Sequence, residues 1–113
     1  MRQVFVSDAN TYALVNGPDP TIQAPGDVIV KVTATTVCSS DVHILAGHMN
    51  TPWGFTLGHE FVGVVHETGP AVQNLKTGDR VVAPAAPWCG SCPTCRRGQF
   101  QKCERGGIFG SGA

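Results

Sequence analysis

Four of the five cysteines of this chain lie between positions 89 and 103, and their spacing limits what that segment can fold into. The pattern is C-x2-C-x2-C-x7-C, formed by Cys89, Cys92, Cys95 and Cys103. Two-residue gaps let neighbouring thiolates converge on one ion, and a fourth thiolate from farther along completes the tetrahedron of a structural zinc site. A ferredoxin cluster instead requires C-x2-C-x2-C-x3-C-P, whereas here the last gap is seven residues and Glu104 follows. We therefore predict a zinc-binding lobe over residues 88–104, with free or disulfide-bonded cysteines as the alternative.

Half of the chain's eight basic residues fall in the same segment, namely Arg96, Arg97, Lys102 and Arg105. A nucleic-acid patch is one interpretation, but eight acidic residues balance the eight basic ones, and no aromatic platform accompanies the cluster. Four thiolates around one Zn²⁺ carry a net charge of about −2, which nearby cations offset. We therefore predict no nucleic-acid partner.

Outside this segment the composition is typical of a turn-rich, mainly β domain. The chain has 113 residues, enough for one domain over 1–113, with only 14% charged residues and with 14 Gly and 8 Pro. Its apolar runs are far shorter than the ~18 residues that span a membrane. The N-terminal MRQVFVSDAN has no apolar core of a signal peptide. We expect no membrane partner and a reducing, cytoplasmic location, where clustered cysteines serve as metal ligands.

Local patterns predict several short strands and one short helix. In the clearest strand, the alternation from Val28 to Thr36 predicts one packed and one solvent-facing side. A helix is expected after a cap at Ser39 or Ser40, with Gly47 at its end. Gly63 lies inside another strand and predicts a bend or a close backbone approach. The expected strands cover residues 2–6, 12–15, 28–36, 61–67 and 80–83, which suggests a small, bent β-barrel.

The fifth cysteine, Cys38, follows the clearest strand, and His59 and Glu60 precede the next long one. These three side chains are competent zinc ligands, and a site with few protein ligands leaves a position open for substrate. Ser40 lies two residues after Cys38, so on an extended chain both face the same way. The spacing alone leaves open that Cys38 is a small buried hydrophobe and that Ser40 caps a helix.

The blocks at residues 37–43, 58–65 and 78–81, together with the four-cysteine segment, closely resemble the zinc-containing alcohol dehydrogenases of the medium-chain dehydrogenase/reductase superfamily. The order and spacing of all four blocks match, and the similarity covers essentially the whole chain. It implies the fold of that family's N-terminal catalytic domain, a mainly β, GroES-like bent barrel with short helices and a four-cysteine zinc lobe.

The resemblance also implies two zinc ions per chain, one catalytic and one structural. Cys38 and His59 match the ligands of the catalytic zinc, and Glu60 matches an additional, sometimes exchanging ligand. The four cysteines match the ligands of the structural zinc. Zinc then acts as a Lewis acid that lowers the pKa of a bound alcohol.

Three further residues match the family's proton-transfer machinery. Ser40 matches the hydroxyl that takes the proton of the alcohol, and His43 matches the imidazole that passes it to solvent. Asp41 matches the carboxylate that orients the metal-bound histidine, although an acidic residue in a first helical turn is favourable without any metal. Trp53 and Phe55 could shape a substrate pocket or simply pack in the core.

No nucleotide-binding fingerprint follows a strand and opens a helix in this sequence, although residues 106–113 are rich in glycine. We therefore expect the chain to be the first part of a longer NAD- or NADP-dependent enzyme, a homodimer or homotetramer that interconverts an alcohol and an aldehyde or ketone. The chain alone, with an unfinished barrel, is expected to be inactive. The alternative is a free-standing zinc-binding GroES-like module without catalytic activity.

Overall fold

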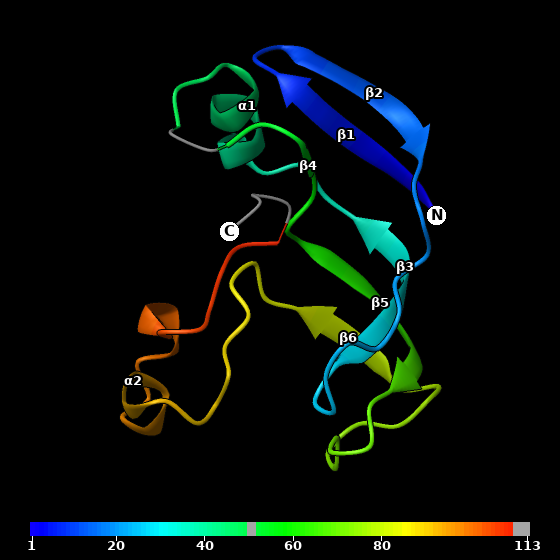
Figure 1. The fold of residues 1–113 in the computed structure, drawn as a ribbon, viewed down its shortest axis with the longest axis vertical. Helices are drawn as coiled ribbons and strands as arrows, with labels where there is room; N and C mark the ends of the chain where they lie inside the picture. The colour runs from blue at the N-terminus through cyan, green and yellow to red at the C-terminus, as the bar shows by residue number, and fades with distance from the viewer. Residues whose placement is uncertain (50–51, 110–113) are drawn as a thin grey trace.

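The computed structural model describes residues 1–49 and 52–109 as two small open sheets, a short helix packed beside the first sheet, and a cysteine-rich lobe with a second short helix (Figure 1). The first sheet has the order β2-β1-β4 and the second the order β3-β5-β6. The mainly β architecture with short helices is therefore confirmed. The elements are β1 (Arg2–Asp8), β2 (Thr11–Asn16), β3 (Val28–Thr35), α1 (Ser39–Leu45), β4 (Phe55–Thr56), β5 (Phe61–Thr68), β6 (Arg80–Ala83), α2 (Pro93–Arg96) and the 3₁₀ turn η1 (Phe100–Lys102).

All strand pairs are antiparallel, and the register of β3 against β5 shifts twice. The second shift lies between Val32, which pairs with Gly63, and Ala34, which pairs with Val62. A Cβ atom on Gly63 would collide with the backbone oxygen of Lys31. The predicted close backbone approach at Gly63 is thus confirmed, because the two strands come too near each other there for any side chain.

A small core fixes α1 against the first sheet. Val6 from β1, Ile44 from α1 and Phe55 from β4 form one buried cluster. The backbone N–H of Asn10, at the tip of the β1–β2 hairpin, donates to Leu45 at the end of α1 over 2.7 Å. Phe55 therefore belongs to the core, where its ring helps to hold the helix whose first residues enter the candidate site.

The helix begins one residue earlier than the sequence predicts. Cys38 is its N-cap, and Ser39 and Ser40 already lie in the first turn. Gly47 follows the C-cap with φ +73°, the left-handed conformation that commonly ends helices. The expected end of the helix is thus confirmed, whereas the expected cap at Ser39 or Ser40 was wrong. The N-cap is Cys38, and the Asp41 carboxylate in the first turn accepts its backbone N–H, as in a capping box.

Two further features differ from the strands expected from the sequence. A two-residue strand, β4, lies outside the five expected strands and pairs with β1. In β3 the expected alternation of packed and solvent-facing side chains fails. Val32 is 51% exposed, and consecutive residues from 31 to 35 are all exposed, whichever face of the sheet they lie on. No described element covers this part of β3. Of the glycine-rich stretch 106–113, positions 110–113 lie outside the described residues.

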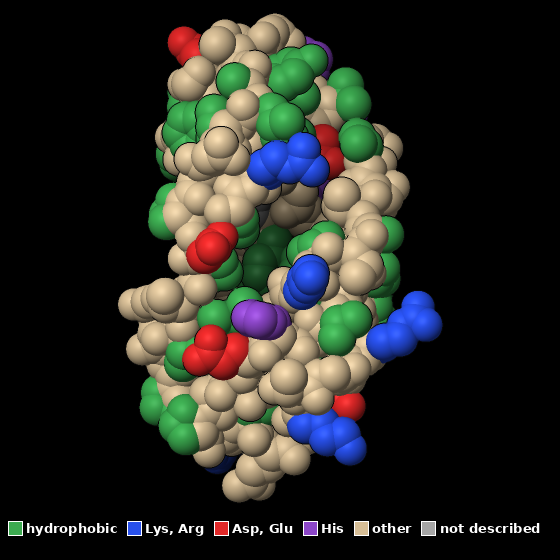
Figure 2. Space-filling model, turned by 90° about the vertical axis from the view of Figure 1, so that its right-hand side faces the viewer, with side chains coloured by type: hydrophobic (Ala, Val, Ile, Leu, Met, Phe, Trp, Pro, Cys, Tyr) green, Lys and Arg blue, Asp and Glu red, His purple; other side chains and the backbone are tan. Residues whose placement is uncertain are grey.

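No helix in the described part of the chain is long and apolar enough to cross a membrane. Figure 2 shows one face of the molecule, where acidic and basic side chains are interspersed around a hollow with hydrophobic side chains at its bottom.

Candidate metal centres

The structure brings Cys38, His59 and Glu60 together at the junction of α1 and β5. One candidate ligand atom from each of the three residues lies within 4.8 Å of the other two. His59 is 5% exposed, and the other two residues are half-buried. Cys38 is distant in sequence from the adjacent residues His59 and Glu60, but together they form one group with a thiol, an imidazole and a carboxylate, a donor set that suits zinc.

Backbone bonds hold the two chain segments of this group in place. Cys38 is fixed at the helix start, where the Asp41 side-chain atom Oδ2 accepts its backbone N–H over 2.8 Å. The carbonyl oxygen of Glu60 accepts two bonds from the end of β3, from the Thr35 hydroxyl at 2.8 Å and from the Thr36 N–H at 3.2 Å. Hydrogen bonds therefore hold the backbone of both segments that carry the candidate ligands, the start of α1 and the residues before β5.

The His59 ring lies between two partners from the first turn of α1. Its Nδ1 is 3.2 Å from Oδ1 of Asp41, and its Nε2 is 3.2 Å from the Ser40 hydroxyl oxygen. Asp41 is only 2% exposed, and its Oδ1 has no well-aligned hydrogen bond among the described residues. A carboxylate beside Nδ1 favours a proton on that nitrogen and leaves Nε2 as the electron-pair donor. The residues present thus fit a metal ion bound through Nε2.

The thiol and the imidazole of this group influence each other's pKa. Hydrogen bonds from Ser40 and from His59 lower the pKa of the Cys38 thiol. The pKa of His59 is raised, first by its hydrogen bond with the Cys38 sulfur and then by the Asp41 charge, against the opposing effect of burial. Without a metal, the two shifts favour a pair of thiolate and imidazolium. The thiolate is the form that binds metals, whereas His59 gives up its second ring proton when it binds one.

His43 lies on the exposed side of α1. Within the described residues, its ring has a hydrogen-bond partner in His48, with the two Nδ1 atoms 3.5 Å apart. The ring centroids are 5.8 Å apart, so the rings point nitrogen to nitrogen. The backbone N–H of His48 also donates to the His43 carbonyl over 2.9 Å. Local sequence pattern does not predict this pairing, because His48 follows the end of α1 in a segment without regular periodicity.

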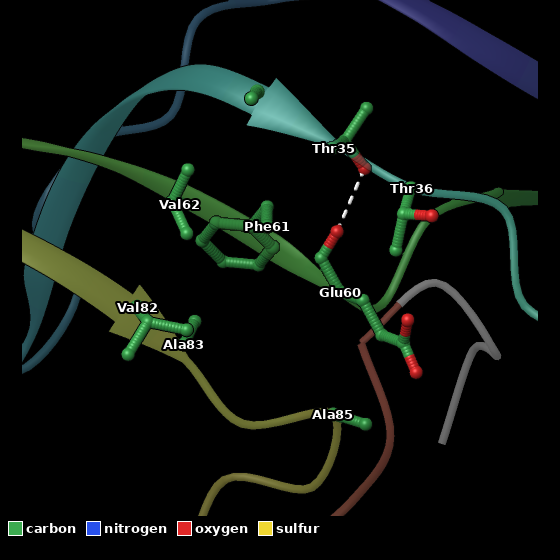
Figure 3. Close-up of a pocket in the computed structure, with 9 residues that line it drawn as sticks. Thr35, Thr36, Glu60, Phe61, Val62, Val82, Ala83 and Ala85 are labelled. Atoms are coloured by element: carbon green, nitrogen blue, oxygen red, sulfur yellow. Dashed lines mark hydrogen bonds between the residues drawn. The ribbon is translucent and has the colours of Figure 1, made fainter.

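A hollow of about 510 Å³ adjoins the first group, and Glu60 belongs to both (Figure 3). The volume is in the range of small-molecule sites, which are mostly apolar with a few polar groups. Figure 3 shows the Glu60 carboxylate just before the start of β5, while Phe61 and Val62 form one wall. Sequence patterns did not reveal this hollow, since its lining comes from three strands: Ala34, Thr35, Thr36, Glu60, Phe61, Val62, Val82, Ala83 and Ala85.

The four cysteines of the lobe form a second group of sulfur atoms, all within 4.8 Å of one another. The Cys92 and Cys103 sulfurs are 4.0 Å apart, close to the edge of roughly 3.8 Å of a tetrahedron with zinc–sulfur bonds of about 2.3 Å. All four are free thiols in the structure. Gly90 and Gly98 have φ of +70° and +75°, which turns the chain sharply around the sulfurs. This arrangement fits one tetrahedral zinc ion.

The lobe also contains polar contacts to sulfur that the sequence analysis missed. The Thr94 hydroxyl lies 3.0 Å from the Cys92 sulfur, and the Ser91 hydroxyl donates to the Cys89 sulfur over 3.6 Å. Hydroxyl residues placed between closely spaced cysteines are the signal that could have revealed these contacts.

The thiols of the lobe differ in acidity. Backbone N–H groups of Ser91 and Cys92, with the Ser91 hydroxyl, lower the pKa of Cys89 to about 5. The Thr94 hydroxyl lowers the pKa of Cys92 to about 7. Burial raises the pKa of Cys95 to about 12 in the absence of a metal. A bound cation would offset that burial and stabilise all four thiolates.

The chain is similar to several known proteins. The model of the alcohol dehydrogenase GroES-like domain family matches residues 24–113. Zinc-type alcohol dehydrogenase B of Aspergillus flavus is 39% identical over 110 residues, which are 97% of this chain and 26% of that protein. The alcohol dehydrogenase TADH from Thermus sp. ATN1 is 42% identical with a TM-score of 0.93, covering 100% of this chain and 33% of that one.

A third similar protein is the alcohol dehydrogenase rspB of Escherichia coli CFT073, whose structure holds NADH. It is 30% identical with a TM-score of 0.84, and the match covers 100% of this chain and 33% of that one. The chain thus spans about a quarter to a third of the length of these similar proteins.

Proposed function

Because the chain belongs to the family of alcohol dehydrogenase GroES-like domains, we propose that it forms the zinc-binding, N-terminal catalytic domain of an enzyme that interconverts an alcohol and an aldehyde or ketone. One observation carries the proposal, the convergence of Cys38, His59 and Glu60 beside the Ser40 hydroxyl. Cys38, His59 and Glu60 hold the catalytic zinc in this proposal, and the four cysteines of the lobe hold the structural zinc.

The residues around the catalytic group have separate tasks. When bound, zinc supplies a Lewis acid that stabilises negative charge on the oxygen of an alcohol. Ser40 can both donate and accept a hydrogen bond, and its position 3.2 Å from His59 Nε2 places it next to the ligands, where it can take the alcohol's proton. Asp41 holds the His59 ring through Nδ1.

His43 completes the proposed path for the proton. It lies three residues after Ser40 on α1, on the exposed side of the helix. Side chains with this spacing are neighbours on a helix, so His43 can receive a proton from the direction of Ser40 and release it to solvent. The exposed His48 beside it is a second basic group at the same exit.

The hydride acceptor in this proposal is NAD or NADP, bound by a part of the enzyme outside the described residues. The support is the similarity of this chain to a third of the E. coli protein whose structure holds NADH. The substrate is a small molecule, and the mostly apolar hollow next to Glu60 is where its carbon chain can lie. Assembly into a homodimer or homotetramer and a cytoplasmic location remain predictions from the resemblance.

A spectroscopic experiment on the 113-residue chain tests the proposal. Loading with Co²⁺ in place of zinc gives visible bands that respond to the ligands of the ion. The Cys92→Ser variant removes one lobe ligand, and the Cys38→Ser variant removes one ligand of the other group. We expect trifluoroethanol, an alcohol that resists oxidation, to shift the bands of Cys92→Ser but not those of Cys38→Ser.

Two results contradict the proposal. One is the absence of any shift in Cys92→Ser, which means that the ion beside Ser40 has no position for an alcohol. The other is an equal shift in Cys38→Ser, which places alcohol binding at the lobe. The 113-residue chain alone is also expected not to reduce NAD⁺ or NADP⁺ with simple alcohols, and such activity would contradict the assignment of the nucleotide to another part of the enzyme. It would also weigh against the alternative of a non-catalytic module.

A further inference from the structure

Two consecutive hydrogen bonds connect Arg105, the residue directly after the lobe, with the sulfur atom of Cys89. The Arg105 atom Nη2 donates to the Ser91 hydroxyl oxygen over 2.6 Å, and that hydroxyl donates to the Cys89 sulfur over 3.6 Å. These two hydrogen bonds connect segments that are separated in the sequence by α2 and η1. Neither Arg105 nor Ser91 was a candidate site residue in the sequence.

The direction of these bonds follows from the chemistry of the two side chains. A guanidinium group has only donors, so the Ser91 oxygen accepts from Arg105. A serine hydroxyl has a single proton, and Arg105 leaves that proton free to point at Cys89. Loss of the Arg105 contact would let the Ser91 hydroxyl rotate toward water instead. Arg105 therefore orders the donor that faces the sulfur.

Cys89 is one of the two lobe sulfurs for which such a donor matters. Cys92 and Cys95 are 5% and 4% exposed, whereas Cys89 and Cys103 are partly exposed, and Cys89 precedes the turn at Gly90. Its sulfur also accepts the backbone N–H of Cys92 over 3.4 Å. A partly exposed thiolate can leave a metal ion more readily than a buried one, because water and competing ligands reach it.

We propose that Ser91 and Arg105 are positioning residues that hold Cys89 on the metal ion of the lobe and so slow the loss of that ion. The proposal rests on the proposed lobe metal. It differs from a general effect of positive charge, in which Arg96, Arg97, Lys102 and Arg105 would each offset the negative thiolates to a similar extent. Hydrogen bonds to a metal ligand typically change metal affinity by about 10- to 100-fold.

Metal release tests the proposal in a background that isolates the lobe. All variants carry Cys38→Ser, so that the bound zinc belongs to the four cysteines, and zinc transfer to a chromophoric chelator is timed. The compared variants are Ser91→Ala, Arg105→Ala, the double variant and the control Arg97→Ala. Arg97 carries the same charge on the same lobe, and its side chain makes no hydrogen bond within the described residues.

We expect Ser91→Ala and Arg105→Ala each to release zinc about 10-fold faster than the background, and Arg97→Ala to release it at the background rate. The double variant should match Ser91→Ala alone, because Arg105 acts through Ser91. With Co²⁺ in the lobe, both single variants should shift the sulfur-to-cobalt absorption, and Arg97→Ala should not.

Four outcomes overturn the proposal. Equal release from Arg97→Ala and Arg105→Ala shows a general charge effect, and a double variant with the product of the two single effects shows independent action. Unchanged release from both single variants shows that the hydrogen bonds do not hold the metal. A background protein with no zinc at all removes the lobe metal itself, and that outcome is recognised from the initial metal content before any rate is measured.

Discussion

Asp41 offers the sharpest perturbation of the candidate catalytic group, because both of its carboxylate oxygens face N–H donors. Oδ2 accepts the Cys38 N–H over 2.8 Å, and Oδ1 lies 3.2 Å from His59 Nδ1, which carries the ring proton when Nε2 binds a metal. The Asp41→Asn variant keeps the shape but replaces one oxygen with an NH₂ group. Whichever way the amide turns, one buried donor then faces another donor.

The expected cost follows from that mismatch. The side chain is 3% exposed, so water cannot replace the lost acceptor. A buried donor left without a partner costs about 1–3 kcal/mol, which corresponds to roughly a 5- to 140-fold loss of affinity at about 1.4 kcal/mol per factor of ten. We expect zinc affinity at Cys38, His59 and Glu60 to fall by this factor, since the variant disturbs two ligands at once.

Competition with a chromophoric zinc chelator measures this loss. The variants are made with Cys92→Ser, so that the measured zinc belongs to the group next to Asp41. The matched control is Asp8→Asn, because Asp8 is exposed and its Oδ1 accepts only the neighbouring Ala9 N–H, a bond that an amide oxygen can keep. An affinity of Asp41→Asn within twofold of the control would refute the reasoning that this carboxylate supports the metal ligands.

Two further predictions concern the close strand approach and the lobe thiols. In urea titrations, Gly63→Ala should lower the free energy of unfolding of the zinc-loaded chain by about 1–3 kcal/mol, because its Cβ meets the backbone of Lys31. The control Gly26→Ala should leave this free energy unchanged, because a Cβ there meets nothing within 4 Å. Equal effects of the two variants would contradict the strand register. In the metal-free chain at about pH 5.5, Cys89 should be the thiol that iodoacetamide alkylates fastest, because its pKa of about 5 keeps it mostly as thiolate. The rate of alkylation of Cys89 should fall as the pH drops through about 5. Mass spectrometry of the labelled peptides identifies the thiol that reacts first, and a faster reaction of Cys95 would contradict the predicted order.

The sequence predicted the strands well because short-range pattern decides them. The strands over 61–67 and 80–83 are found within one residue of their expected ends, as β5 and β6. The positive φ of Gly47 and the tight approach at Gly63 were also predictable, because in each case the backbone conformation excludes most other residues.

Other features depend on contacts between distant segments and could not be predicted from local pattern. The start of α1 lies at Cys38, where the Asp41 carboxylate in the first turn accepts the backbone N–H of the N-cap residue, as in a capping box. β4 has only two residues, and its pairing with β1 depends on burial of Phe55 in the core. How far the side chains of β3 are buried depends on which other elements pack against the strand, and the alternation of residue types does not specify those elements.

The candidate site divides in the same way. The spacing of the four lobe cysteines predicted a group that the structure brings within 4.8 Å. The meeting of Cys38 with His59 and Glu60 was expected from the family resemblance, since nothing in the spacing of these residues requires it. The contacts of Ser91 and Arg105 with the lobe were not expected at all, because they depend on side-chain directions across a turn.

The metal content of the purified, zinc-loaded chain tests the central claim most directly. The two groups of ligands predict two zinc ions per chain, one ion in Cys92→Ser, one in Cys38→Ser and none in the double variant. A single zinc ion per chain that is lost in Cys92→Ser but kept in Cys38→Ser would contradict the account, because it would leave only the lobe as a metal site.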